Sequence, residues 1–298
     1  MRSLITIVLV CLLRNLEAAT VKNWTYSNTK RDWPLLPKTS CGGSSQSPID
    51  IDTNLTTSEK NNSPTDNQIW INYTPRPKLK IENNGKTLWV NGDMGSILYN
   101  NQTYTAIQFT FHQPAEHTLS GHRPDMEMVI THRHPTTSSL LHFALFFSIQ
   151  PNSPDNTFLA SIGYDNPVLG GLRSFAPITE LNLLDLFLPY NMDQVKAWDY
   201  MGSLTSPPCT EGQRYVVFGE ERGMSRRQWD GFARSVGGID WEGKRGNFRE
   251  VMEKGGREVW GRVLEVREEG REREEERQVW GWVVGVVVGA VWVSSRRP

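Results

Sequence analysis

Apolar and polar side chains alternate along several short segments of the chain. Residues 104–112 and 126–132 both have the two-residue period of a strand with one buried face. In the first segment, one face is predicted to hold Ile107, Phe109 and Phe111, and the other Gln108, Thr110 and His112. In the second, Met128 and Ile130 are predicted to lie opposite Glu127, Val129 and Thr131. Both segments are therefore predicted to be strands.

Four further segments complete the predicted secondary structure. The nearly continuous apolar run from Leu140 to Ile149 is typical of a strand that is buried on both faces. Residues 79–81 and 88–90 flank the breaker Asn83-Asn84-Gly85 and are predicted to form a strand pair. Residues 179–187 are predicted to form a short helix. The pattern predicts a mainly β protein of the α+β class, with few helices.

Size and charge restrict the classes of function. The chain has 298 residues, of which 38% are hydrophobic, and its formal net charge is -1. This length suffices for one large domain with a full core or for two small ones. The near-neutral charge provides no electrostatic footprint for nucleic acid, so we expect no nucleic-acid partner.

The first 19 residues have the features of an export signal. Arg2 supplies the positive start, and the apolar run from Leu4 to Leu13 is too short to span a bilayer. Ala18 and Ala19 offer a cleavage region. The alternative is a buried segment of a cytosolic protein. We interpret residues 1–19 as a signal peptide.

Glycosylation sequons and cysteine usage agree with export. After loss of the signal, Cys41 and Cys209 are the two remaining cysteines, and a single distant pair in an exported protein predicts one disulfide. The alternative is a pair of buried free thiols. Sequons mark candidate glycosylation sites in surface loops, and they occur at Asn23, Asn54, Asn61, Asn72 and Asn101.

The end of the chain differs in composition from the rest. A mixed-charge segment, residues 262–278, precedes an apolar stretch that begins at Val279, and two arginines follow near the C-terminus. One interpretation is a charged stalk with a membrane anchor over residues 279–298, although the apolar stretch is shorter than a typical span. A lipid-anchor signal is a second interpretation. The third is that this tail is an artefact of translated non-coding sequence, because its dominant residue types share G-rich codons.

Seven segments resemble the alpha carbonic anhydrases, in the order that this family has them. They cover roughly residues 24–261, which sets the predicted domain at residues 20–261. The matching segments are SQSPIDI (45–51), LKIENNG (79–85), IQFTFH (107–112), EHT (116–118), MEMVITH (126–132), GSLTSPPCTEG (202–212) and NFREV (247–251). The resemblance implies a large, twisted, mostly antiparallel sheet with short peripheral helices. It also implies the Cys41–Cys209 disulfide of extracellular members.

The same resemblance assigns zinc-ligand positions to three residues on two neighbouring strands. The family holds its catalytic zinc with three histidines, and the matching positions here are Thr110, His112 and Val129. Threonine is a weak neutral ligand and valine cannot ligate at all, so two of the three ligands are missing. One imidazole does not make a tetrahedral site of useful affinity. We therefore expect no cofactor, or zinc only through rearranged ligands.

The positions around the ligands largely match the family. The resemblance implies that Gln108 and Glu127 orient ligand histidines, as outer-shell groups do. It implies that Thr205 and Glu116 align the zinc-bound hydroxide, with His117 and Tyr200 supporting them. Because an unpaired buried carboxylate is costly, we expect Glu127 to contact His117. The resemblance also assigns Lys86 to the family's proton-relay position, where the high ordinary pKa of lysine would make it a poor shuttle near neutral pH.

The remaining histidines do not predict a replacement metal site. The resemblance implies that Phe143 stands where the family has a smaller apolar residue lining the site, so Phe143 is predicted to fill space left by the missing ligands. Strand alternation would then turn His142 away from the site. A recruited site of His112 with Glu116 or Glu127 is the alternative. The predicted function is an acatalytic extracellular or cell-surface binding module with an unknown protein partner or none. A zinc-dependent carbon dioxide hydratase is the competing hypothesis.

Overall fold

The computed structural model describes residues 24–27, 29–55, 68–164, 166–187, 194–236 and 246–268. The predicted signal peptide, the sequons at Asn23 and Asn61, and the tail from residue 269 lie outside these residues. Within them, no helix combines the length and the apolar character that crossing a bilayer requires.

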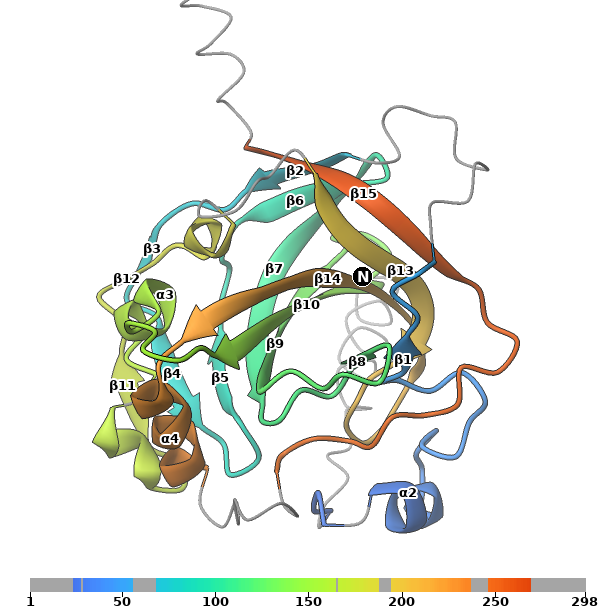
Figure 1. Cartoon of the computed structure of the whole chain (residues 1–298), viewed down its shortest axis with the longest axis horizontal. Coiled ribbons are helices and arrows are strands. Elements are labelled where there is room, and N and C mark those ends of the chain that lie inside the picture. Colours follow the sequence, from blue (N-terminus) through green and yellow to red (C-terminus); the bar gives the residue numbers. More distant parts are fainter. Residues whose placement is uncertain are drawn as a thin grey trace, which may run out of the picture.

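The structure is dominated by strands (Figure 1). Its helical elements are α2 (Thr29–Asp32), η1 (Trp33–Leu35), α3 (Thr157–Ser161), η3 (Pro167–Gly170), η4 (Leu183–Leu186) and α4 (Arg226–Ser235). Its strands are β1 (Asp50–Ile51), β2 (Gln68–Asn72), β3 (Arg76–Pro77), β4 (Lys80–Asn83), β5 (Leu88–Asn91), β6 (Ser96–Tyr99), β7 (Gln102–His112), β8 (Thr118–Leu119), β9 (Met126–Arg133), β10 (Leu140–Ile149), β11 (Phe175–Pro177), β12 (Glu180–Leu181), β13 (Val195–Ser203), β14 (Glu211–Met224) and β15 (Val259–Glu268). The mainly β prediction is confirmed.

One large sheet curls until it meets itself. The strand order is β11-β4-β5-β7-β6-β2-β15-β13-β14-β10-β9, and β7 also pairs with β9. This second pairing closes a circuit from β7 through β6 and β15 back to β9, which is the ring of strands seen in Figure 1. Most pairs are antiparallel, and the exceptions within this sheet are β10 with β14 and β15 with β2. The predicted large, mostly antiparallel sheet is therefore present.

Several local predictions agree with the observed elements. The apolar run at 140–149 is strand β10, and β4 pairs with β5 through Ile81 opposite Val90. Gly85 has φ of 81°, so the turn between β4 and β5 uses a conformation that glycine adopts without strain. The predicted helix at 179–187 is instead the short strand β12 followed by the single 3-10 turn η4.

A bulge in β7 interrupts the alternation that was predicted for residues 104–112. Ala106 lies opposite His132 and Gln108 opposite Thr131, so Ile107 is an extra residue without a partner on β9. A bulge of this kind moves the following side chains to the other parity. Ala106 and Phe109 consequently both belong to the core, whereas Ile107 is half-buried rather than sharing their face.

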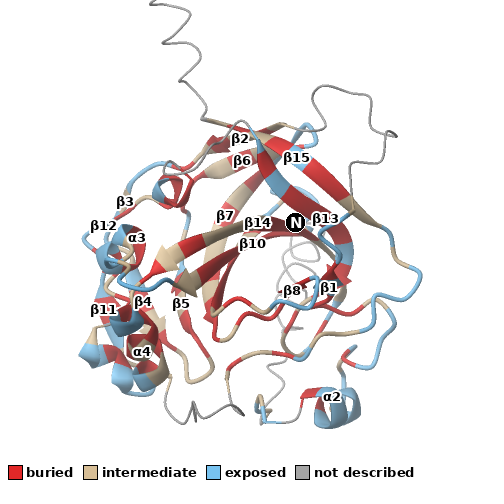
Figure 2. Ribbon diagram, viewed as in Figure 1, coloured by how far each residue is buried: buried red, intermediate tan, exposed pale blue. Residues whose placement is uncertain are grey.

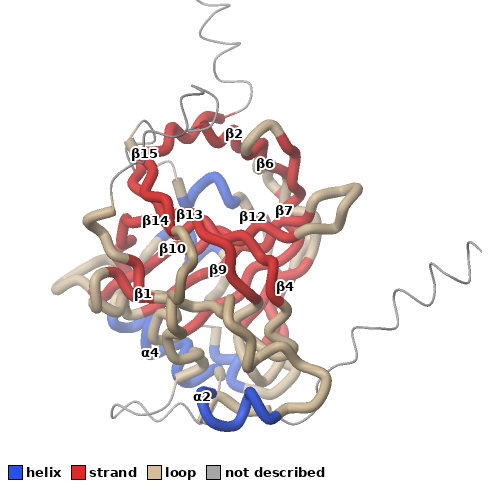
Figure 3. Tube along the Cα trace, turned by 90° about the vertical axis from the view of Figure 1, so that its right-hand side faces the viewer, coloured by secondary structure: helices blue, strands red, loops and turns tan. Residues whose placement is uncertain are grey.

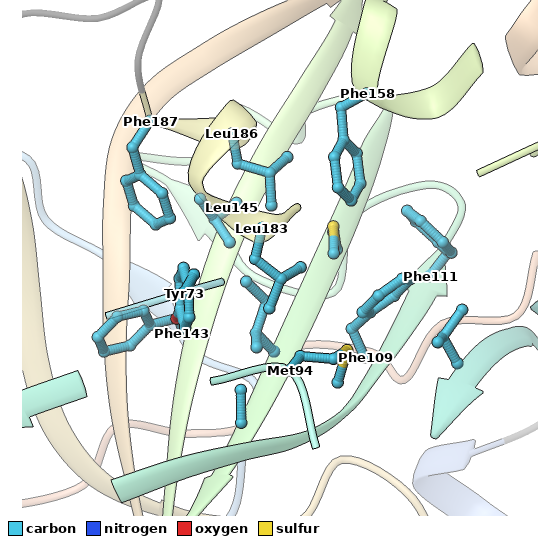
Figure 4. Close-up of a cluster of buried hydrophobic side chains, with 14 of the residues drawn as sticks. Tyr73, Met94, Phe109, Phe111, Phe143, Leu145, Phe158, Leu183, Leu186 and Phe187 are labelled. Carbon is cyan, nitrogen blue, oxygen red and sulfur yellow. The ribbon is translucent and has the colours of Figure 1, made fainter. Parts of the chain in front are cut away.

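The sheet separates two apolar cores. The larger core includes Phe109 and Phe143, which lie among the side chains drawn in Figure 4. The smaller core lies on the other face and includes Val129, Ala144 and Phe146. Strand β10 is buried on both faces, as Figure 2 shows, because its odd-numbered residues enter the larger core and its even-numbered ones the smaller.

This arrangement overturns the prediction that Phe143 lines the candidate site. Phe143 is fully buried in the larger core, 4.6 Å from His132 and 5.1 Å from Phe218 between ring centroids. His142 has the opposite parity, so it lies on the same face of the sheet as Val129. The prediction from the family resemblance therefore had the two faces of β10 reversed, because His142 and not Phe143 lies on the face of the ligand positions.

The sheet continues beyond the predicted domain end at residue 261. Strand β15 lies between β13 and β2, and its residues up to Glu268 are paired although they begin the charged segment. Side chains of β15 alternate between the core and solvent, since Leu264 and Val266 are buried whereas Val263 is 45% exposed. This alternation allows a charged segment to form a strand of the sheet. Arg262 contributes through its guanidinium, which lies 3.7 Å from the buried Asp199 carboxylate.

The helices and the N-terminal segment lie outside the sheet (Figure 3). Helix α4 begins with a capping box, in which the Ser225 hydroxyl accepts a hydrogen bond from the Gln228 backbone amide and the Gln228 side chain accepts one from the Ser225 backbone amide. The N-terminal segment is fastened by the Cys41–Cys209 disulfide, which packs with Trp33 in a small apolar cluster. The predicted cysteine pair is confirmed.

Candidate functional site

The three positions assigned to zinc ligands lie together on one face of the sheet. Thr110 of β7 pairs with Val129 of β9, and His112 pairs with Glu127 one step further along. Val129 in turn pairs with Ala144 of β10. The antiparallel register therefore brings together the residues that the sequence analysis connected, over the strands that lie side by side in Figure 1.

The His112 ring is held in one orientation by the backbone. Its Nδ1 lies 2.8 Å from the carbonyl oxygen of Asn247, and its Nε2 lies 3.4 Å from the Thr110 hydroxyl. A carbonyl can only accept a hydrogen bond, so Nδ1 carries the proton of the neutral ring. The Nε2 lone pair is then directed toward Thr110, which can donate its hydroxyl hydrogen.

These side chains do not fit a zinc ion with three protein ligands. They provide one imidazole, one hydroxyl and one isopropyl group, and an isopropyl group has no donor atom. The neighbouring Ala144, which pairs with Val129, adds no ligand either. Over the described part of the chain, no group of three or more His, Cys, Asp or Glu residues is arranged to hold a metal.

Glu127 is fully engaged in hydrogen bonds. Its Oε2 accepts from the backbone amides of Glu116 and His117, both at 2.8 Å, and its Oε1 lies 2.8 Å from Nδ1 of His117. Burial raises the pKa of Glu127, but the charge and hydrogen bonds of His117 lower it below its ordinary value overall. The expected contact between Glu127 and His117 is thus present.

The His117 ring extends this network across the sheet. Its Nε2 lies 2.7 Å from the Tyr200 hydroxyl, which lies 2.7 Å from the hydroxyl of Ser47. Nδ1 donates to the Glu127 carboxylate, and Nε2 and the Tyr200 hydroxyl share the next hydrogen bond of the network. The Ser47 hydroxyl also accepts from the Ser203 amide at 3.0 Å. All of these groups are buried, so the network fixes the positions of Glu127 and His117.

Glu116 is a second buried carboxylate beside His112. Its Oε1 accepts from the Arg249 amide at 2.9 Å and lies 3.4 Å from Nδ1 of His112. Its Oε2 has no hydrogen-bond partner among the described residues. Burial raises the pKa of Glu116, while His112 and the nearby Thr205 hydroxyl lower it to a smaller extent. Thr205 therefore lies near Glu116, as the family positions imply.

Lys86, which the family resemblance assigns to the proton-relay position, is held by Trp24 of the N-terminal segment. Lys86 Nζ donates to the carbonyl oxygen of Trp24 and lies 4.7 Å from the centroid of the Trp24 ring. Partial burial lowers the pKa of Lys86. Gln108 is half-buried on the same face as Thr110, two residues before it.

Sequence reasoning assigned no role to three residues that shape the site. The Tyr26 ring lies 6.5 Å from that of His112, and its hydroxyl pKa is raised well above the ordinary value by burial and by Glu116. Asn247 holds His112 through its backbone and donates from its side chain to the Phe111 carbonyl at 2.7 Å. Arg249 orients Glu116. Asn247 and Arg249 both belong to the NFREV segment, which contributed to the family resemblance. That segment was the sequence signal that could have identified them.

The described sequons differ in exposure. Asn54 and Asn101 are exposed in turns, and Asn101 has a positive φ of 58°. Asn72 is half-buried at the end of β2, where it pairs with Ser96. Asn54 and Asn101 are therefore the more accessible candidates for glycosylation.

Comparison with known proteins identifies the family. The sequence profile of the family described as Eukaryotic-type carbonic anhydrase matches residues 28–263. The chain belongs to the alpha carbonic anhydrase family. A carbonic anhydrase of Neisseria gonorrhoeae is 31% identical over 65% of this chain and 71% of its own. Dioscorin DB3L of Dioscorea polystachya is 29% identical over 70% of this chain and 71% of its own.

The solved structures agree with this assignment. The alpha carbonic anhydrase of Thermovibrio ammonificans, solved with the inhibitor sulfanilamide, has a TM-score of 0.64 and 27% identity. The similarity covers 80% of this chain and 98% of that protein. The alpha carbonic anhydrase fold implied by the seven segments is confirmed.

Proposed function

We propose that this member of the carbonic anhydrase family does not hydrate carbon dioxide and acts outside the cell as a binding module. One observation carries the proposal: Thr110 and Val129 face each other at two of the three positions assigned to zinc ligands. His112 is then the one imidazole of the set, and a single imidazole does not hold zinc in the geometry that activates water.

The contacts of the nearby carboxylates argue against a rearranged zinc site. Glu127 already accepts three hydrogen bonds, and withdrawing it would leave the Glu116 and His117 amides buried without an acceptor. Oε1 of Glu116 already accepts a hydrogen bond from the Arg249 backbone amide. Recruiting either carboxylate to His112 would therefore break buried contacts that the fold already makes. Zinc distances tolerate little misplacement, which adds to this cost.

One purified sample of the full chain tests the proposal. Zinc content per chain and carbon dioxide hydration are measured together, with and without added zinc. We expect zinc far below one ion per chain and hydration at the uncatalysed rate. A His112→Ala variant serves as the matched control and should give the same values, because the wild-type ring is not expected to hold a metal. Stoichiometric zinc with sulfonamide-sensitive turnover would refute the proposal.

The extracellular location has its own support and its own test. The Cys41–Cys209 disulfide joins two segments 168 residues apart, and such bonds persist in oxidising compartments. The exposed sequons at Asn54 and Asn101 are accessible to glycosylation. We expect protein from secreting cells to carry the disulfide and glycans, detected as a mass loss after glycosidase treatment. Free thiols and an unmodified mass would contradict this location.

A further inference from the structure

Strand β2 carries a sequon asparagine on the outer face of the sheet. Its residues Ile69 and Ile71 are buried in the larger core. Trp70 and Asn72 alternate with them and are both half-buried, so they project from the opposite, outer face. Asn72 begins the sequon Asn-Tyr-Thr, residues 72–74. A tryptophan and a candidate glycosylation site therefore lie on the same face of one strand, two residues apart.

The strands on either side of β2 leave this face without an aromatic or hydrogen-bonding partner. Trp70 pairs with Leu98 of β6 and with Arg267 of β15, and Asn72 pairs with the small Ser96 of β6. Among the described residues, no hydrogen bond engages the side chain of Trp70 or Asn72, and no other ring contacts Trp70. Trp70 and Leu98 thus form a short apolar strip that ends at a free side-chain amide.

The other described sequons lack this arrangement. Tyr99 precedes Asn101 by the same two residues, but Tyr99 is 2% exposed and belongs to the larger core, so a group attached to Asn101 in its turn does not reach the ring. Asn54 follows the acidic Asp52 at that spacing. The sequence pattern alone does not separate Asn72 from Asn101. The direction in which each aromatic residue faces does.

The chemistry of an N-linked sugar matches the surface at Trp70. One face of a pyranose ring presents C–H groups, which pack against the face of an aromatic ring as other apolar groups do. The hydroxyl groups at the edge of the sugar stay in water. Side chains two residues apart on a strand are separated by about 6.5–7 Å, a distance that one sugar spans. A sugar on the Asn72 amide is therefore positioned to remove the remaining exposed surface of Trp70 from water.

We propose that Asn72 carries an N-linked glycan whose first sugar packs on the Trp70 ring and covers the outer face of β2. Nδ2 of Asn72 forms a bond to C1 of an N-acetylhexosamine, the bond from C1 to a lipid-linked pyrophosphate breaks, and the amide releases one proton. Transfer occurs during export, before the strands pair, so the partial burial of Asn72 in the folded chain does not prevent it. The inference rests on the extracellular location in the proposed function and not on the loss of zinc ligands.

Variants at Thr74 test the glycan without changing Asn72 or Trp70. Thr74 is exposed and lies after the end of β2. In full-length protein from secreting cells, peptide mass spectrometry should find a sugar on Asn72, which Thr74→Ala removes and the matched control Thr74→Ser keeps. The Tm of Thr74→Ala should be about 2–4 °C lower than that of Thr74→Ser, because one contact comparable to an aromatic pair is lost. Protein from a bacterial periplasm, which forms disulfides without glycosylating this sequon, should show no difference.

Trp70→Leu tests the ring. In its presence, the Tm difference between Thr74→Ala and Thr74→Ser should fall below about 1 °C. Circular dichroism shows whether Trp70→Leu folds, and nuclear Overhauser contacts between the first sugar and the Trp70 ring test the same contact in the wild type. An unmodified Asn72, an equal Tm difference with and without a folded Trp70→Leu, or absence of these contacts overturns the inference. Glycans on Asn54 or Asn101 with an unmodified Asn72 would overturn it alone, whereas an unglycosylated chain with free thiols would also contradict the extracellular location.

Discussion

Replacing Thr110 and Val129 with histidine should create a zinc site in this protein. The two residues are direct cross-strand neighbours, and both share a face with His112. Directly opposed positions on antiparallel strands have Cβ atoms about 4.5–5.5 Å apart, which lets imidazoles from both strands converge on one ion. His112 already exposes its Nε2 lone pair toward position 110, because Asn247 holds the other ring nitrogen. The double variant needs no change in backbone or in the ring that is already present.

The size of the effect follows from burial and mass action. Val129 is 5% exposed, so a larger side chain there costs about 1–3 kcal/mol of stability, reduced by the small Ala144 opposite it. Zinc at about a thousand times its dissociation constant stabilises the folded state by about 4 kcal/mol. For a domain of this size, about 1 kcal/mol shifts Tm by about 2–4 °C. The zinc-dependent rise in Tm should therefore be about 8–16 °C.

Calorimetry of the Thr110→His, Val129→His double variant with and without zinc measures this rise directly. The matched control is Thr103→His with Val263→His, which changes the same residue types at exposed strand positions. The control should show no zinc-dependent rise. If the double variant folds but its Tm does not respond to zinc, then the surrounding groups are not arranged for the ligands and the reasoning is wrong. Any regained hydration should stay slow while Lys86 occupies the relay position.

Three other perturbations have defined outcomes. Cys209→Ser should lower the free energy of unfolding by about 4–5 kcal/mol in denaturant titrations, because the disulfide closes a very long loop. Burial lowers the pKa of His132 to about 3, so the unfolded chain binds its proton first and stability should fall as pH drops from about 6.5 toward 3. His132→Gln should reduce that slope by up to about 1.4 kcal/mol per pH unit. Phe143→Ala should cost about 3–5 kcal/mol in the same titrations, because Phe143 is fully buried in the larger core.

Each of these outcomes can fail in a distinct way. An unchanged unfolding midpoint for Cys209→Ser under non-reducing conditions would mean that the disulfide does not constrain the unfolded chain. An identical pH slope in wild type and His132→Gln would show that this histidine is not the group that titrates. A loss of less than about 1 kcal/mol in the Phe143→Ala variant would contradict the placement of Phe143 in the core.

Much of the sheet was predictable from local pattern. The apolar run at 140–149 and the strand pair around Gly85 needed only the two-residue period and turn chemistry, and both lie where they were expected. The bulge at Ile107 was not predictable, because an extra residue leaves no mark in composition and appears only against the register of β9. The same limitation reversed the faces of His142 and Phe143. When both faces of a strand are buried, both sets of alternating side chains are apolar, so the sequence pattern does not show which set faces the site.

The amino-acid sequence by itself determined which donor atoms exist at positions 110, 112 and 129, and no folding can add a donor atom to a valine. It also determined the order of the family's segments, whereas the bond between Cys41 and Cys209 was one of two alternatives until the structure brought them together. Only the tertiary structure decided which other groups meet: that Glu127 also accepts from the backbone amides of residues 116 and 117, that Asn247 orients His112, and that the charged residues after 261 complete strand β15. Side-chain identity is local, whereas register and strand neighbours are set by pairings between residues far apart in the chain.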